Sequence, residues 1–228
     1  MKAKTIIGGA VLAASVLTGP ALAGALSANI GVSSNYIFRG VTQTLDQAAV
    51  SGGLDYEHDS GFYAGTWISN VGSGSNALYG AQGNYEQDWY AGYGFEAGPV
   101  GLDVGYILFT YPVGPGQYDY GEIYVNASWE WLSGGINYTV NKEGSPANKN
   151  DVYLFVTGEF PVGNGLTLSG TVGNYNYDDP ATEDYVHFQV ALSKDDFTFA
   201  LDKNDLTDTG NGEDDVRFSI SWSKSFDL

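Results

Sequence analysis

Apolar and polar residues alternate with a period of two along most of the chain after residue 24, which is the pattern of β-strands with one apolar and one polar face. Residues 216–223 show it clearly, with Val, Phe, Ile and Trp on one face and Arg and three Ser on the other. We therefore predict an all-β fold of about twelve strands. They are expected at residues 26–38, 48–57, 62–70, 84–95, 100–110, 120–129, 134–141, 151–160, 166–174, 185–193, 197–203 and 215–226.

The connections between these segments alternate between short and long. The short ones are residues 58–61, 96–99, 130–133, 161–165 and 194–196, and the long polar ones are residues 39–47, 71–83, 111–119, 141–150, 175–184 and 204–214. A soluble sandwich has no reason to sort its loops in this way, whereas outer-membrane barrels combine short periplasmic turns with longer extracellular loops. The pattern predicts a transmembrane antiparallel β-barrel.

Ionisable residues in the predicted strands fall mostly on the polar face, and Lys224 near the predicted periplasmic end is the main exception. A charge on the lipid face near the membrane midplane costs about 2–4 kcal/mol, so a bilayer enforces this sorting. A soluble sandwich would enforce a similar one, and the pattern alone does not separate the two. For a barrel, the candidate lumen or constriction residues are Asp55, Glu57, Glu86, Asp88, Asp103, Glu122, Glu159, His187, Asp202, Arg39 and Arg217.

Two further features of the sequence fit a barrel, namely aromatic residues near the strand ends and a last strand that continues to the end of the chain. Aromatic residues near strand ends are expected to form interfacial girdles: Tyr36, Phe38, Trp89, Phe95, Trp129, Trp131, Tyr138, Phe160, Phe197 and Phe226. The alternation continues from Ile220 to Leu228 at the end of the chain. Because a barrel has no free edge, this last strand is expected to pair with the first.

The first 23 residues have the composition of a secretory signal peptide. Lys2 and Lys4 precede a short apolar run from Ile6 to Leu17, and Ala21-Leu22-Ala23 fits a small-x-small cleavage site. The apolar run is too short for a comfortable membrane helix. We expect a cleaved signal peptide at 1–23 and an outer-membrane barrel at 24–228, in the outer membrane of a Gram-negative bacterium.

The net charge of −18 and the absence of Cys narrow the possible functions. Disulfides and thiolate metal sites are excluded, and a nucleic-acid binder would need a basic face. The acidic excess indicates either surface solubility alone, an acidic lumen, or loops that bind divalent cations bridging to lipopolysaccharide. Expected partners are outer-membrane lipid and lipopolysaccharide, the barrel-assembly machinery and small solutes, with no cofactor and no metal site assigned.

Three stretches resemble the TorF family, proteobacterial proteins proposed to be porins. They are SNYIFRGVTQT (Ser34–Thr44), SGGLDYEHDSGFYAGTWISNV (Ser51–Val71) and YEQDWYAGYGFEAG (Tyr85–Gly98), and the C-terminal half resembles the family only in pattern. The resemblance implies an outer-membrane barrel with a pore function. It implies no substrate and no catalytic residues.

An enzyme is the least favoured interpretation. The chain has two His, His58 and His187, and no HExxH, GxSxG or phosphate-loop motif. An outer-membrane lipase would need Ser and His together on the lipid-facing side, but His187 is predicted to face inward. The acid pairs Asp55/Glu57 and Glu86/Asp88 could act as acid and base, although a hydrated acidic wall explains them as well.

The chain contains only two arginines, Arg39 and Arg217. If the barrel closes, they are expected at the outer ends of neighbouring strands, with both side chains inward. Together they would create a transverse field or a carboxylate-binding point at the mouth. The alternative is that each pairs with a nearby acid and anchors a loop.

Three functions follow in order of preference. The first is a narrow porin for small solutes whose acidic lumen favours cations or neutral molecules. The second is a closed barrel with a structural or surface-interaction role and no transport, and the third is an outer-membrane enzyme.

Overall fold

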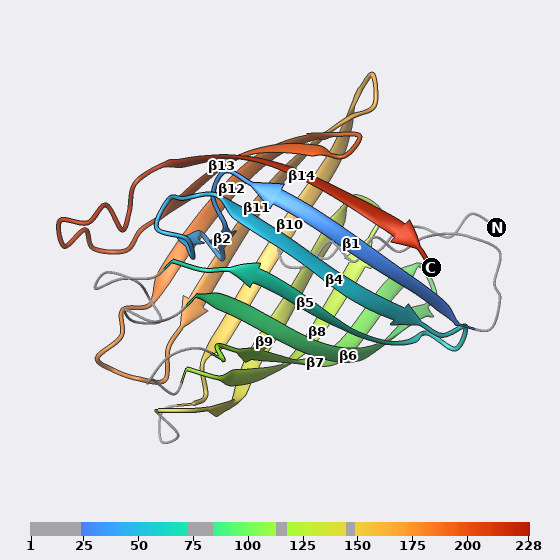
Figure 1. Ribbon diagram of the computed structural model, residues 1–228, viewed down its shortest axis with the longest axis horizontal. Coiled ribbons are helices and arrows are strands. Elements are labelled where there is room, and N and C mark those ends of the chain that lie inside the picture. Colours follow the sequence, from blue (N-terminus) through green and yellow to red (C-terminus); the bar gives the residue numbers. More distant parts are fainter. Residues whose placement is uncertain (1–23, 73–83, 113–117, 145–148) are drawn as a thin grey trace.

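A computed structural model of the chain describes residues 24–72, 84–112, 118–144 and 149–228, and these form a closed antiparallel barrel (Figure 1). Each strand pairs with its neighbours along the chain, and the last strand pairs with the first. The twelve barrel strands are β1 (Ala25–Ser33), β4 (Ala49–Glu57), β5 (Phe62–Asn70), β6 (Tyr85–Ala97), β7 (Val100–Thr110), β8 (Tyr120–Trp129), β9 (Leu132–Lys142), β10 (Val152–Gly163), β11 (Leu166–Asn176), β12 (Tyr185–Lys194), β13 (Phe197–Asn204) and β14 (Arg217–Asp227). The predicted barrel is confirmed. The proposed signal peptide at 1–23 lies outside the described residues.

Closure of the barrel involves the last residues of the chain. Strand β14 pairs with β1 over a register that runs from Ser27 opposite Asp227 to Ser33 opposite Ser221. The backbone N–H of Leu228 donates to the carbonyl of Leu26 at 2.9 Å, which extends the pairing to the final residue. Because β1 pairs with β4 on its other side, the sheet has no free edge at this point.

The strand bounds place short connections at one end of the barrel and long ones at the other. Residues 58–61, 98–99, 130–131, 164–165 and 195–196 connect strands at the end that holds both Ala25 and Asp227. The opposite end carries the ends of the long connections, with described residues 34–48, 71–72, 84, 111–112, 118–119, 143–144, 149–151, 177–184 and 205–216. We call the long-loop end the outer end and the other the inner end. Within the described residues, no helix is long and apolar enough to cross a membrane.

The two faces of the barrel wall differ in chemistry. The outward face carries large apolar side chains that are about half exposed, such as Val156 at 54% and Phe218 at 55%. Trp89, Trp129 and Trp131 also point outward and are 50–52% exposed. An apolar outer surface of this extent is unfavourable in water and favourable against lipid hydrocarbon.

Tyrosine side chains cover glycines on the inner face of the wall. A Cβ added to Gly65 would collide with the ring of Tyr90, and one on Gly105 would collide with the ring of Tyr124. In the same way, Gly92 lies under Tyr63. A missing side chain on one strand thus leaves room for an aromatic ring from the adjacent strand, and the rings fill part of the barrel interior.

The prediction for the first strand was wrong at its C-terminal end. Strand β1 ends at Ser33 instead of residue 38, and the following residues turn back into the barrel as a small hairpin of β2 (Ile37–Phe38) and β3 (Val41–Thr42). Its two-residue turn consists of Arg39 and Gly40, with φ values of 50° and 78°. Positive φ at both central positions is the geometry of a type I′ hairpin turn. Alternation alone does not reveal where a strand folds back on itself.

This change of direction also corrects the girdle prediction for two aromatic residues. Tyr36 and Phe38 lie within the hairpin segment inside the barrel, and Phe38 is only 9% exposed. We call residues 34–48 the plug segment. In Figure 1 the short blue segment around the label β2 contains its hairpin.

Candidate functional site

The plug segment lies in the lumen and contacts most of its wall. Among its side chains, Asn35, Arg39, Gln43 and Thr44 are each no more than 6% exposed. Its contacts reach β6, β8, β10, β11, β12, β13 and the start of β14. A segment that touches walls on opposite sides of a closed barrel occupies the space between them.

The strongest contact of the plug segment is a buried ion pair. The guanidinium of Arg39 donates two hydrogen bonds to the carboxylate of Glu122 on β8, at 2.9 and 2.6 Å. Both side chains are almost fully buried, at 3% and 1% exposed. The charged plane also stacks on aromatic rings, with the guanidinium carbon 4.1 Å from the centroid of Tyr153 and 5.1 Å from that of Tyr175. Two parallel hydrogen bonds fix both the position and the orientation of Arg39.

The carboxylate of Glu86 on β6 accepts hydrogen bonds from two tyrosine hydroxyls. The hydroxyl of Tyr36 in the plug segment donates to Glu86 at 2.7 Å, and the hydroxyl of Tyr111 donates to the other oxygen at 2.5 Å. The ring of Tyr36 also packs edge-on against Trp67, with centroids 5.4 Å apart. Glu86 is thereby held by hydrogen bonds without a basic partner, and it joins the plug segment to β6.

The hairpin turn sits against the opposite wall. Its Gly40 carbonyl accepts a hydrogen bond from the Asn204 side chain at 2.8 Å. A Cβ at Gly40 would collide with the side chain of His187, whose Nε2 lies 2.8 Å from the hydroxyl of Tyr153. Glycine is therefore required here for two reasons, the positive φ and the close approach to His187.

The two arginines do not share one partner. Arg217 bonds through Nε to Asp46 at 2.8 Å and donates to the carbonyls of Gly212, Glu213 and Asp215 in the preceding loop. Arg39 binds Glu122 on β8, whereas Arg217 lies at the start of β14, and these two strands are not neighbours in the sheet. The expected placement of Arg39 at the end of a barrel strand was wrong, because the chain leaves the wall at Ser33. Each arginine instead anchors a segment to its own carboxylate.

Several buried polar atoms around the plug segment have no hydrogen-bond partner among the described residues. They are Nε of Arg39, both carboxylate oxygens of Asp88, Oγ1 of Thr139, Nδ1 of His187 and Oδ2 of Asp202. Thr139 lies opposite Glu122 in the sheet, and Asp88 lies two residues from Glu86 on β6. Buried polar groups in proteins are almost always paired, either with protein atoms or with ordered water.

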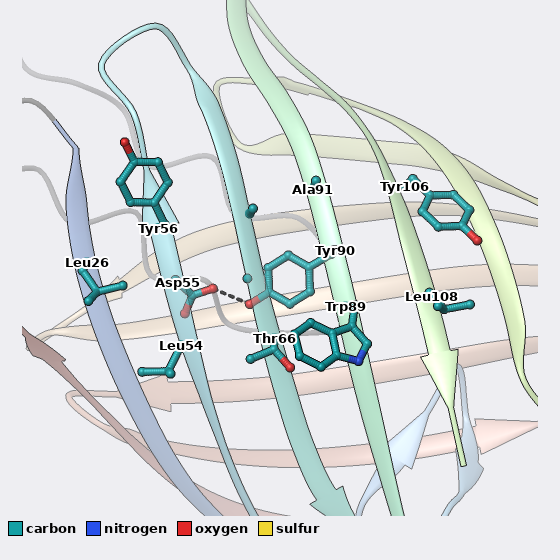
Figure 2. A pocket seen from close by; sticks show the side chains of 12 residues that line it. Leu26, Leu54, Asp55, Tyr56, Thr66, Trp89, Tyr90, Ala91, Tyr106 and Leu108 are labelled. Carbon is teal, nitrogen blue, oxygen red and sulfur yellow. Dashed lines mark hydrogen bonds between the residues drawn. The ribbon is translucent and has the colours of Figure 1, made fainter. Parts of the chain in front are cut away.

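The inner half of the lumen carries two carboxylates with matching partners. Asp55 accepts hydrogen bonds from the side chains of Asn29, at 3.1 Å, and Tyr90 (Figure 2). Asp103 accepts from Tyr63 at 2.6 Å and from the side chain of Asn126 at 3.2 Å. Both Asp residues remain partly exposed. Hydrogen bonds from neutral groups hold these charges in place without neutralising them.

The candidate lumen residues thus divide between two levels. Around the plug segment are Arg39, Glu86, Asp88, Glu122, His187, Asp202 and Arg217, each at most 8% exposed. Toward the inner end are Asp55, Glu57, Asp103 and Glu159, which are partly exposed. Their role in a constriction stays a prediction. The sequence analysis assigned no lumen role to the phenols of Tyr36, Tyr111 and Tyr153. A signal was available for Tyr153, because Tyr153 and Phe155 lie on the same face of one strand.

A shallow groove of about 500 Å³ lies on the wall near β4–β7 (Figure 2). It runs between the outward side chains Leu54, Tyr56, Trp89 and Tyr106 over the small residues Ala64 and Ala91. No Ser and no His lines it, so it does not contain the pair that an outward-facing esterase site would need. Among the residues that the structure describes, no group of three or more His, Asp or Glu is placed to hold a metal ion.

The profile of the bacterial family described as "Bacterial protein of unknown function (Gcw_chp)" matches residues 18–211. These residues include the three stretches on which the resemblance to TorF proteins was based, but the match does not itself carry that name. Among curated proteins, none matches the chain.

Solved structures with a similar fold include two of the KdgM porin. One gives a TM-score of 0.55 at 10% identity and covers 88% of this chain and 99% of that chain. The other, in complex with disordered oligogalacturonate, gives 0.51 at 8%, covering 90% and 99%. The COG4313 outer membrane channel from Pseudomonas putida F1 gives 0.51 at 12%, covering 91% and 97%. At such identities the similarity shows a shared barrel fold.

Proposed function

The chain belongs to the Gcw_chp family of bacterial proteins of unknown function, and we propose that it is an outer-membrane channel for small solutes whose lumen favours cations and neutral molecules over anions. The observation that carries the proposal is the inner half of the lumen. There Asp55 and Asp103 are partly exposed, and each is held by neutral donors. Fixed negative charges along a pore wall attract cations and repel anions.

The location in the outer membrane is part of the same proposal. A closed barrel with an apolar outer face and a polar interior suits a bilayer, and the short-loop end would face the periplasm. We further propose that residues 1–23 are a signal peptide removed on export. Lipid, lipopolysaccharide and the barrel-assembly machinery are the partners that such a route implies.

The solute class follows from charge. One barrel of similar fold has been solved with oligogalacturonate, a chain of acidic sugars. Such a ligand needs positive charges on the wall, whereas both arginines in this barrel are already bonded to carboxylates. The lumen of this protein therefore suits small cations or neutral solutes better than polyanions.

Planar bilayers test the proposal. Refolded protein is expected to give discrete conductance steps and, in a KCl gradient, a reversal potential of the sign set by preferential K⁺ passage. A reversal potential that indicates preferential Cl⁻ passage would contradict the proposed selectivity. Migration on gels with and without boiling checks the fold first, because folded barrels of this kind migrate differently before heating.

A closed barrel without transport is the second candidate, and the plug segment favours it. If the lumen is permanently filled at the level of Arg39 and Glu122, folded protein will show no conductance in any variant. We propose no enzymatic role, and esterase assays on folded protein are expected to give only the background rate.

A further inference from the structure

The plug segment is attached to the wall at its two ends, through side chains and through two backbone hydrogen bonds. The N–H of Ser34 donates to the carbonyl of Ile220 at 2.9 Å, and the N–H of Gly72 donates to the carbonyl of Gln43 at 2.7 Å. Strands β1 and β4 pair continuously up to Ser33 opposite Ala49, so the segment begins and ends at one point of the rim. Beyond that point it forms no strand pairs with the wall and pairs only with itself, between β2 and β3. It can therefore move as a unit about the Ser33–Ala49 pair once these two backbone bonds and its side-chain contacts break, while the strand registers of the barrel stay intact.

Several buried polar atoms near the plug segment have no protein partner among the described residues. Here Asp88 is 0% exposed, and neither of its carboxylate oxygens has a partner among the described residues. Nε of Arg39 and Nδ1 of His187 also have no hydrogen-bond partner among the described residues. Water would satisfy all of these atoms once the segment left, which offsets part of the contacts that would be lost.

The plug segment also carries local backbone strain. Arg39, Leu45 and Asp46 all have positive φ, at 50°, 55° and 58°, although none is glycine. Such conformations cost free energy and persist only when surrounding contacts hold them. For Arg39 the surrounding contacts are Glu122 and the stacked rings.

We infer that the plug segment, residues 34–48, is a gate that closes the outer end of the lumen, with the Arg39–Glu122 ion pair as its latch. The inference rests on the proposed channel function and adds how that channel is closed. In the closed state the segment occupies the lumen between β6–β8 and β10–β13. In the open state it swings outward about the Ser33–Ala49 pair, and Glu86, Asp88 and Glu122 become hydrated walls of the passage.

Latch variants test the inference in planar bilayers. Arg39→Ala, and separately Glu122→Gln, are expected to raise the fraction of time in the open state at least about tenfold, because removing one partner leaves the other buried and unpaired. Lys142→Ala is the matched control. It removes an ion pair of similar length, to Asp151 at 2.7 Å, that does not involve the plug segment. An equal open fraction in wild type and both latch variants would overturn the inference.

A reversible lock gives the opposite perturbation. The chain has no cysteine of its own, so introduced thiols are unambiguous. A Cβ at Gly72 would lie 2.8 Å from Cγ of Leu45, so cysteines at these two positions would place their side chains against each other. Leu45→Cys with Gly72→Cys, oxidised and verified by mass spectrometry, is expected to abolish openings, and reduction is expected to restore them. Equal conductance in the oxidised and reduced forms would contradict the inference that the plug segment is a gate.

The labelling rate of an introduced cysteine tests the movement of the plug segment without a conductance measurement. Gln43 is 5% exposed, so the thiol of a Gln43→Cys variant should react slowly with a membrane-impermeant maleimide. Adding Glu122→Gln should accelerate the reaction at least about tenfold. Faster labelling in proteins that never conduct would support a moving segment while rejecting the channel. Unchanged labelling in conducting proteins would reject the gate and keep the channel. Gel migration of unboiled samples confirms that each variant is folded.

Discussion

At the scale of single residues, Gly40 shows how a missing Cβ positions the plug segment. The turn brings its backbone against His187, and its φ of 78° is unfavourable for other residues. In the sequence, Arg39-Gly40 opens the connection predicted at residues 39–47, and nothing local marks it as a two-residue hairpin turn inside a barrel. The contact with His187 depends on a residue 147 positions later (187 − 40), which no local pattern reveals.

Gly40→Ala is expected to displace the hairpin. The substitution combines the cost of a left-handed alanine, about 1–2 kcal/mol, with a collision against His187. Gly98→Ala is the matched control, because Gly98 has a φ of 65° but nothing within 4 Å of its added Cβ. We expect a lower midpoint of thermal unfolding for Gly40→Ala than for Gly98→Ala, and faster protease cleavage within residues 34–48. Equal midpoints would show that the close approach to His187 is not limiting.

Asp55 and Asp103 are expected to set the charge selectivity of the lumen. Asp55→Asn and Asp103→Asn should each lower the ratio of K⁺ to Cl⁻ permeability, and the double variant should lower it further, because each removes a fixed charge from the wall. The reversal potential in a KCl gradient measures the ratio. Asp59→Asn removes the same charge from the exposed turn between β4 and β5 and should leave the ratio unchanged. A shift as large for Asp59→Asn would mean that surface charge, not the wall, decides selectivity.

The side to which each acid points could be predicted from the sequence, but its partner could not. Period-two alternation fixed the inward parity of Glu122 and Asp88 because successive side chains of a strand point to opposite faces. The partner of Glu122 is 83 residues away, in a segment whose path alternation does not specify. Likewise, Glu86 is held by two phenols from a loop and the plug segment, which no acid-base pattern would indicate.

At the scale of elements, the strands were predictable and the plug segment was not. Predicted and observed bounds agree within a few residues for the strands from β4 to β14, since lipid on one side and polar groups on the other enforce strict alternation. Residues 34–38 were assigned to the first strand as well, but there Tyr36 and Phe38 lie inside the lumen. Phe38 lies edge-on to Phe109 at 5.6 Å instead of facing outward. Alternation indicates two different surroundings for the two faces, and it does not identify them.

The loop between β13 and β14 should lose order in acid. Hydrogen bonds from Thr209 and Asn211 hold the pKa of Glu213 below its usual value of 4.5. A lowered folded-state pKa means that the ionised carboxylate stabilises the loop above about pH 4.5, and that this contribution is lost as the pH falls toward the folded-state pKa. Amide hydrogen exchange of residues 209–213, corrected for intrinsic rates, should rise from pH 6 to pH 3.

A Glu213→Gln variant serves as the control for this pH dependence. Its loop should exchange faster than wild type at pH 6, and its corrected rates should change less between pH 6 and pH 3. The amides of β13 should show no such change, since their backbone hydrogen bonds belong to the barrel. A wild-type loop with constant corrected rates over this range would contradict the proposed role of Glu213.

At the scale of the whole molecule, pairing of the first and last strands closes the sheet into a barrel. The closed sheet separates an apolar outer surface from a polar lumen. The alternation that continues to Leu228 predicted this closure, because a barrel has no free edge and its last strand must pair on both sides. What the sequence could not predict is the division of the interior. The outer half is filled by the plug segment, where Arg39 offsets Glu122, and the inner half keeps partly exposed acids.

This division predicts a salt dependence for the proposed channel. If fixed carboxylates on the inner wall select cations, their field reaches about 10 Å in 0.1 M salt and about 3 Å in 1 M salt. The permeability ratio of K⁺ to Cl⁻ should therefore fall toward the ratio of their free mobilities between these concentrations. Selection by pore size or by a directly coordinated ion would not follow the screening length. Reversal potentials at a constant fourfold KCl gradient, centred first near 0.1 M and then near 1 M, distinguish these cases. A permeability ratio that stayed constant would assign selectivity to the geometry of the lumen and not to Asp55, Asp103 and their neighbours.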